Sequence, residues 1–304
     1  MSLPLWRVES LALPLLATIF IAGCAQSPEP TPVPAGLKGG VQPSPLEYIP
    51  PPTPSGYAPR PFRWVPPQSS GPPVPRDPEI DRILRGLLRA NVSAPKDEYF
   101  ILYWIARVYP LAEVEEAARA GALDADRRLP ESAVERALLR SIDPDYRPPW
   151  VGCAANATPA LCAHYYGLYC DILPLPLDLL PALRAAVRKE GGLHPSLLLG
   201  LAEMERRGCG GPEAREALRD AQDSILGRMA ELYSSGRARS LLFAEWAATL
   251  IWTGARDRLQ PEWMAAIQAR LEAEAPLLER GDSSASAGEV LWGTLATLLW
   301  RQGR

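Results

Sequence analysis

Apolar residues recur at helical spacing over most of the chain, from Asp77 to Arg304. In the first such stretch Asp77 is a typical N-cap residue, Pro78 suits the first turn of a helix, and apolar side chains follow at positions 80, 83, 84, 87 and 88. The next stretch, 93–110, is apolar nearly all round at its centre, which predicts a buried helix. Further helices are predicted near 111–120, 130–141, 158–171, 177–190, 195–208, 212–233, 239–253, 261–279 and 285–301.

Glycines stand where several of these helices are predicted to end. Gly121, Gly191, Gly208 and Gly254 occupy positions typical of C-cap glycines. Residues 143–157 have no helical pattern and are expected to form the one long loop. Because no run of alternating β-branched residues occurs, almost no sheet is expected.

Strongly apolar helices alternate with more charged ones. The apolar helices begin near His194, Ala238 and Ser283, at similar intervals, and Thr158 begins a fourth copy at shorter spacing. Arrays of helical hairpins bury their core in this way, with apolar helices inside and charged ones outside. The predicted fold class is therefore all-α, an array of helical hairpins arranged as an α/α toroid or an α-solenoid, and an irregular helical bundle is the alternative.

An apolar run from Leu11 to Ile21 lies near the N-terminus. It is too short to span a bilayer as a helix and has the length of a signal-peptide core. It ends in Ile21-Ala22-Gly23-Cys24, which resembles the lipobox of bacterial lipoproteins. The resemblance covers residues 1–24 only. It implies that residues 1–23 are a signal peptide, that Cys24 carries a diacylglyceryl group, and that the protein is lipid-anchored on the extracytoplasmic face of the cell membrane, or on the outer membrane if the host has one.

Residues 24–76 are rich in proline, and the chain has 34 prolines in all. Proline removes a backbone donor and fixes φ, so this segment is expected to be a disordered or extended tether before an all-helical domain at 77–304. Tyr48, Phe62 and Trp64 leave two alternatives open. The segment can be a proline-rich ligand for an aromatic groove, or its aromatic residues can dock on the domain.

Four cysteines remain after Cys24. An extracytoplasmic location favours disulfides between them, and the absence of a C-x-x-C spacing disfavours a zinc site. If consecutive apolar helices run parallel, their like ends lie together, which favours the pairs Cys170–Cys209 and Cys153–Cys162. Four reduced thiols are the alternative.

Charge and motifs exclude several classes of function. The net charge is −3, and lysine and arginine form no basic stripe, so a nucleic-acid partner is not expected. The sequence contains no nucleophile elbow, zinc-protease motif, phosphate loop or calcium loop. No cofactor and no metal are therefore predicted.

Three polar residues have positions that favour a site inside the array. Glu245, Glu289 and His164 each lie about two turns into a predicted inner helix, where they could stand at one level of a central pocket. Two carboxylates with aromatic walls are typical of carbohydrate cleavage. The alternative is that the glutamates face solvent or pair with arginines and that His164 belongs to the core. The candidate stacking surfaces are Tyr165, Tyr166, Tyr169, Trp246 and Trp292.

Two functions follow from different classes. The first is a membrane-anchored binding or scaffold module whose helical domain recognises a glycan, a peptide or an envelope protein. The alternative is an α/α-toroid enzyme, of glycoside hydrolase or lyase type, that acts on polysaccharide. The sequence leaves it undecided whether the protein is an enzyme.

Overall fold

The computed structural model describes residues 56–69, 71–90, 98–128, 137–148, 153, 159–188, 194–238, 241–281 and 286–303. The signal peptide, Cys24 and the tether as far as residue 55 lie outside these residues. The described part contains ten α-helices and two 3-10 helices. They are α1 (Pro78–Arg89), α2 (Glu98–Val108), α3 (Ala112–Arg128), η1 (Leu138–Ser141), α5 (Pro159–Tyr169), α6 (Leu179–Val187), α7 (Pro195–Arg206), α8 (Gly211–Ser234), α9 (Leu241–Trp252), η2 (Arg256–Arg258), α10 (Pro261–Glu279) and α11 (Ala287–Gln302).

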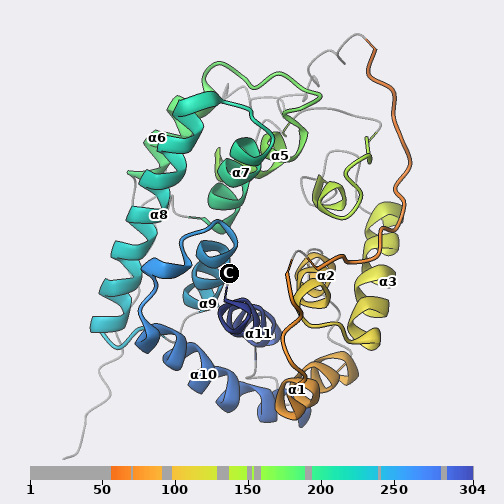
Figure 1. Cartoon of the computed structure of the whole chain (residues 1–304), viewed down its shortest axis with the longest axis vertical. Coiled ribbons are helices and arrows are strands. Elements are labelled where there is room, and N and C mark those ends of the chain that lie inside the picture. Colours follow the sequence, from red (N-terminus) through yellow and green to blue (C-terminus); the bar gives the residue numbers. More distant parts are fainter. Residues whose placement is uncertain are drawn as a thin grey trace, which may run out of the picture. The chain divides into compact units, whose positions relative to one another are not determined.

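The all-α class is confirmed. The described residues include no strand, and their one β-bridge is isolated, between Arg60 and Arg147. Figure 1 shows α9 and α11 surrounded by other helices. No helix in the described part combines the length and the apolar composition needed to cross a bilayer.

Several helix ends lie where the sequence predicts them. The Asp77 side chain accepts a hydrogen bond from the Glu79 amide at 2.9 Å, which caps α1 as expected. Gly208 and Gly254 follow α7 and α9 with φ of +74° and +84°, the left-handed conformation of a C-cap glycine. Gly191 lies outside the described residues.

The prediction that Gly121 ends a helix is wrong, because α3 continues through it to Arg128. A Cβ at Gly121 would lie 2.7 Å from Cβ of Tyr99 on α2. The glycine therefore allows α2 and α3 to approach closely, and the sequence alone does not distinguish this role from a helix end. Of the helix predicted at 130–141, only the 3-10 turn η1 and the residue before it are described.

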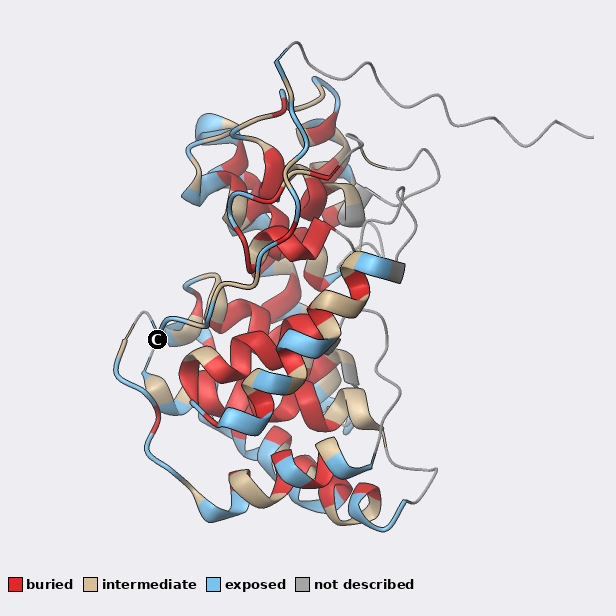
Figure 2. Ribbon diagram, turned by 90° about the vertical axis from the view of Figure 1, so that its right-hand side faces the viewer, coloured by how far each residue is buried: buried red, intermediate tan, exposed pale blue. Residues whose placement is uncertain are grey.

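Burial follows the predicted alternation of helices (Figure 2). All ten residues from Val290 to Leu299 on α11 are buried, and so are most residues of α9. α8 instead has one buried face, which includes Leu218 and Ile225, and exposes the other. α2 is buried nearly all round, as predicted.

The apolar helices pack against one another in sequence order. α5 contacts α7, α7 contacts α9, α9 contacts α11, and α11 contacts α2. Both predicted disulfides are present, with Cα–Cα distances of 5.5 Å for Cys153–Cys162 and 6.1 Å for Cys170–Cys209. Because Cys170 follows α5 and Cys209 follows α7, the carboxyl ends of these two helices lie together. The two helices therefore run in the same direction.

The contact between α5 and α7 is a close approach of two backbones. A Cβ at Gly200 of α7 would lie 2.2 Å from the carbonyl carbon of Ala163. A Cβ at Gly167 of α5 would lie 2.3 Å from the carbonyl oxygen of Gly200. Only glycine fits at these two positions, because real Cβ atoms do not approach a backbone so closely.

Residues 57–69 and 71–76 form an extended segment, which we call the strap, and it packs against the helices. Phe62 and Val74 are buried, and the Val74 amide donates a hydrogen bond to the Val108 carbonyl at 2.8 Å. The Tyr57 hydroxyl donates to the Pro148 carbonyl at 2.7 Å. This differs from the expectation of a free tether up to residue 76. Burial of aromatic surface holds this part of the proline-rich segment on the domain.

Candidate functional site

One pocket formed by described residues has a volume of about 700 Å³. It lies where the last turns of four helices meet: α2, α7, α9 and α11 supply Trp104, Glu203, Trp252 and Leu299. η1 and the strap supply further walls. We call it the arginine pocket, after four lining residues: Arg107, Arg140, Arg206 and Arg207.

Two stacked aromatic rings from different helices line the pocket. The rings of Trp104 on α2 and Trp252 on α9 are nearly parallel, with centroids 4.1 Å apart. Phe100 also contacts Trp104, with ring centroids 4.2 Å apart and the ring planes tilted by 53°. The guanidinium carbon of Arg107 lies 5.2 Å from the Trp252 ring centroid. Such contacts fix the ring planes and place a cation against an aromatic face.

Arg140 is buried, and its guanidinium makes several hydrogen bonds. Its two terminal nitrogens each lie 2.8 Å from an oxygen of Asp171, in a bidentate pair. It also donates to the carbonyls of Leu168 at 2.6 Å and Pro144 at 3.0 Å. Its guanidinium lies 4.8 Å from the Tyr169 ring centroid. Arg140 therefore ties η1 to the end of α5 and has a structural role.

Two carboxylates, Asp171 and Glu203, form ion pairs with three arginines of the pocket. Arg207 pairs with Asp171 at 3.2 Å and with Glu203 at 3.3 Å, and Arg206 pairs with Glu203 as well. Burial alone would raise the pKa of Asp171, but the hydrogen bond and charge of Arg140 and the charge of Arg207 lower it overall. Asp171 is therefore ionised at neutral pH.

Arg107 differs from the other three arginines of the pocket, each of which pairs with a carboxylate. Its Nε donates to the Gln68 carbonyl of the strap at 3.1 Å. Among the described residues, no carboxylate lies within ion-pair distance of its guanidinium. Burial lowers its pKa from the ordinary value, which reflects a desolvated cation. The sequence analysis did not select Arg107.

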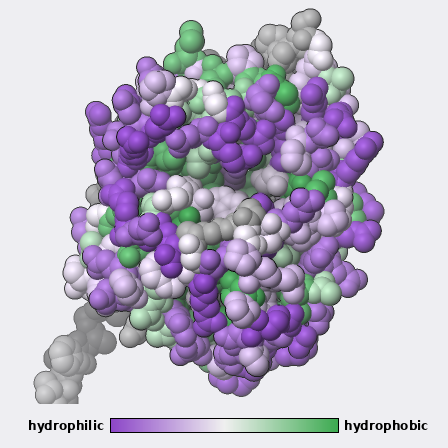
Figure 3. Space-filling model, viewed as in Figure 1, coloured by the Kyte–Doolittle hydropathy of each residue, from purple (hydrophilic) through white to green (hydrophobic). Residues whose placement is uncertain are grey.

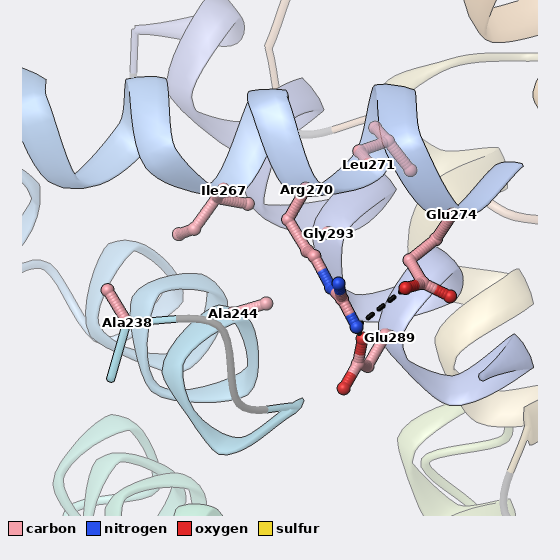
Figure 4. A pocket seen from close by; sticks show the side chains of 8 residues that line it. All are labelled: Ala238, Ala244, Ile267, Arg270, Leu271, Glu274, Glu289 and Gly293. Carbon is pink, nitrogen blue, oxygen red and sulfur yellow. Dashed lines mark hydrogen bonds and ion pairs between the residues drawn. The ribbon is translucent and has the colours of Figure 1, made fainter. Parts of the chain in front are cut away.

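Glu289, one of the predicted catalytic residues, lies in a different part of the molecule. Arg270 of α10 stands between Glu289 and Glu274, at 3.1 Å and 2.6 Å (Figure 4). The cavity beside them has a volume of about 10 Å³, which is the space of about one water molecule. Glu289 is thus ion-paired with an arginine, which is the alternative that the sequence left open. The cavity beside it is too small for a sugar.

His164 and Glu245 do not line the arginine pocket either. His164 is only 5% exposed, packs edge-on to Phe100, and has its pKa lowered to about 4 by burial. It is therefore neutral at physiological pH and enclosed by the core. Glu245 is partly exposed on α9. Neither the arginine pocket nor the cavity beside Glu289 brings Glu245, Glu289 and His164 together.

The predicted stacking residues belong mainly to the hydrophobic core. Tyr165, Tyr169, Trp246 and Trp292 are buried, and Tyr166 is partly buried. The rings of Tyr165 and Tyr169 stack on each other at 4.9 Å. None of the five lines the arginine pocket.

Apolar surface does not mark a second candidate site. Hydrophilic side chains cover most of the face drawn in Figure 3, and apolar ones appear there in small groups. Leu177 and Tyr233 are the exposed large hydrophobic residues among those described. The arginine pocket is therefore the best candidate site.

Sequence reasoning missed this pocket because its residues come from separate segments. Trp104 and Arg107 lie on α2, Arg206 lies on α7 and Trp252 on α9, and no motif joins these three segments. Their shared signal is position, since each lies in the last two turns of an apolar helix.

Within the described residues, no group of three or more histidine, cysteine or acidic side chains is arranged to hold a metal ion. Comparisons with protein-family models, with curated proteins and with solved structures gave no match.

Proposed function

We propose that this protein is a lipid-anchored extracytoplasmic protein whose helical domain is a binding module, and that the arginine pocket is its binding site. The supporting observation is the composition of that pocket. It presents arginines and a tryptophan stack, and its one carboxylate among the described lining residues, Glu203, is held in ion pairs. A general acid or base needs a group that is free to exchange protons with substrate.

The architecture that we propose is toroid-like, with α2, α5, α7, α9 and α11 as parallel inner helices. The sequential contacts from α5 through α7, α9 and α11 to α2 support it. η1 contacts both α2 and α5, and so lies between the two ends of this series. A ring of parallel helices brings all carboxyl ends to one side, where a single pocket forms.

Anchoring is tested by replacing Cys24 with serine. Lipidation requires the thiol of Cys24, so we expect Cys24→Ser to abolish acylation and prevent normal processing of the precursor. The measurement is partition of the protein in detergent phase separation, together with its mass. Two or more acyl chains give durable membrane association, so the wild type is expected in the detergent phase. Unchanged partition and unchanged mass of the variant would contradict the anchor.

Binding and catalysis are separated by one paired assay. The full chain, purified in detergent, is applied to a glycan array, and the glycans that it binds are then incubated with it and tested for new reducing ends. We expect binding without cleavage. Cleavage that is lost in Glu245→Gln or Glu289→Gln would contradict the binding module and support the polysaccharide-active enzyme instead.

A further inference from the structure

We propose that the arginine pocket binds a small anionic ligand through a carboxylate or phosphate group held by Arg107 and Arg206. This inference rests on the proposed binding function and names the chemistry of the ligand. The carboxylate or phosphate can come from an acidic sugar, an acidic peptide or a free phosphate, and the experiment below distinguishes these sources.

The first observation is an excess of positive charge in the pocket. Four arginines line it against one glutamate, and Asp171 behind the lining adds one more negative charge. The chain as a whole carries a net charge of −3, so the positive charge here is a local feature. A concave site lined by one sign of charge concentrates ligands of the opposite sign.

The second observation is the geometry of Arg107. Trp252 lies against its guanidinium and Gln68 accepts from its Nε, so the group is held in place. Its two terminal nitrogens have no hydrogen-bond partner among the described residues. A partly buried guanidinium with free donors suits a bidentate carboxylate or phosphate, because both present two oxygens at matching spacing.

Arg206 of α7 supplies a second cation to the pocket lining. Its side chain is 62% exposed, and it shares the single carboxylate of Glu203 with Arg207. Burial is the main cause that lowers the pKa of Arg107, and the like charge of Arg206 lowers it further. An anion between the two cations would relieve the repulsion between their like charges.

The carboxyl ends of helices offer a competing explanation for the arginines. The partial negative charge at a helix carboxyl end attracts cations by itself, and Arg107 and Arg206 both stand in a last turn. That attraction accounts for the position of the charge. It provides no hydrogen-bond acceptor for the terminal nitrogens of Arg107, and so leaves a role for a ligand.

The pocket also limits the kind of ligand. Its volume of about 700 Å³ lies within the usual range for small-molecule sites. Trp104 covers one face of Trp252 and Arg107 lies against its ring, so a neutral sugar has little free aromatic surface to stack on. Charge is therefore expected to decide the affinity.

The test is calorimetric titration of the full chain in detergent with digalacturonate, with the dipeptide Glu-Glu and with inorganic phosphate. Digalactose and Gln-Gln are the matched neutral probes. We expect at least one anionic probe to bind at least tenfold more tightly than its reference, which is the neutral counterpart or, for phosphate, chloride. We also expect the affinity of that probe to fall as the salt concentration rises. Which anionic probe binds identifies the source.

Arg107→Gln and, separately, Arg206→Gln are each expected to weaken binding at least tenfold. Arg85→Gln removes an exposed arginine of α1 that pairs with Glu113, and is expected to leave binding unchanged. Circular dichroism and thermal unfolding check that each variant folds. Because Arg206 is exposed, its variant keeps the test decisive if Arg107→Gln does not fold.

Absence of binding by all three anionic probes would overturn the inference. The glycan array would then remain as a separate test of the proposed binding function. Equal binding by wild type and Arg206→Gln would overturn it too. Loss of stability in Arg107→Gln, with no anion binding by the wild type, would support the helix-end explanation instead. Anion binding together with glycan cleavage would keep the inference and reject the non-enzymatic function.

Discussion

Replacing Gly200 with alanine is expected to destabilise the protein by about 3 kcal/mol or more. The added Cβ would lie 2.2 Å from a backbone carbonyl carbon of α5, and backbone cannot move aside as a flexible side chain can. The two helices would have to separate. Because α7 also packs on α9, the separation would disturb that contact as well.

Gly227→Ala is the matched control, since it makes the same change within α8. Gly227 is exposed, and a Cβ there meets nothing within 4 Å. Alanine is the better helix former, so this variant is expected to stabilise the protein by about 0.5–1 kcal/mol. Denaturant unfolding of both variants measures the two effects. Equal stability of Gly200→Ala and wild type would mean that α5 and α7 do not approach so closely.

Helix boundaries are the part of the fold that follows most directly from single residues. Proline at the start of α1, α7 and α10 and glycine after α7 and α9 act through local backbone geometry, which the sequence displays. Gly121 and Gly200 depend instead on what a neighbouring helix places opposite them. A glycine that permits close packing has the same appearance in the sequence as one that ends a helix.

The direction of neighbouring helices could also be predicted, and the disulfides follow from it. An array with parallel inner helices brings Cys170 and Cys209 together, and the structure has this bond. The same reasoning placed Glu245, Glu289 and His164 at one level of a shared pocket. Neither the arginine pocket nor the cavity beside Glu289 joins these three residues, because depth along a helix does not determine which way a side chain points, and Arg270 on α10 pairs with Glu289.

The strap shows a different limit of sequence reasoning. Proline content correctly excludes helix and sheet interior from residues 57–69 and 71–76, but it does not determine whether an extended segment is free or bound. Binding is decided by the residues that contact Phe62 and Val74, such as Tyr146 and Val108, which are distant in the chain. Aromatic residues within a proline-rich segment are the signal that raised this alternative.

Removing the Cys170–Cys209 disulfide by a double change to alanine is expected to lower the free energy of unfolding by about 4 kcal/mol. The bond joins residues separated by 39 positions, so it strongly restricts the unfolded chain. Cys153–Cys162 closes a loop of 9 positions, and its removal is expected to cost about 2.5 kcal/mol. In the chain-entropy model the larger loop gives the larger effect.

The comparison uses denaturant unfolding of both double-alanine variants under identical non-reducing conditions. Using alanine at all four positions keeps the substituted side chains alike, although the two pairs differ in surroundings. Peptide mapping without reduction first establishes the pairing in the wild type. A Cys153–Cys209 or Cys162–Cys209 bond would contradict the parallel arrangement of α5 and α7, because Cys209 would then not lie beside the end of α5. A larger loss from the short loop than from the long one would show that native contacts around Cys153, and not restriction of the unfolded chain, carry the stabilisation.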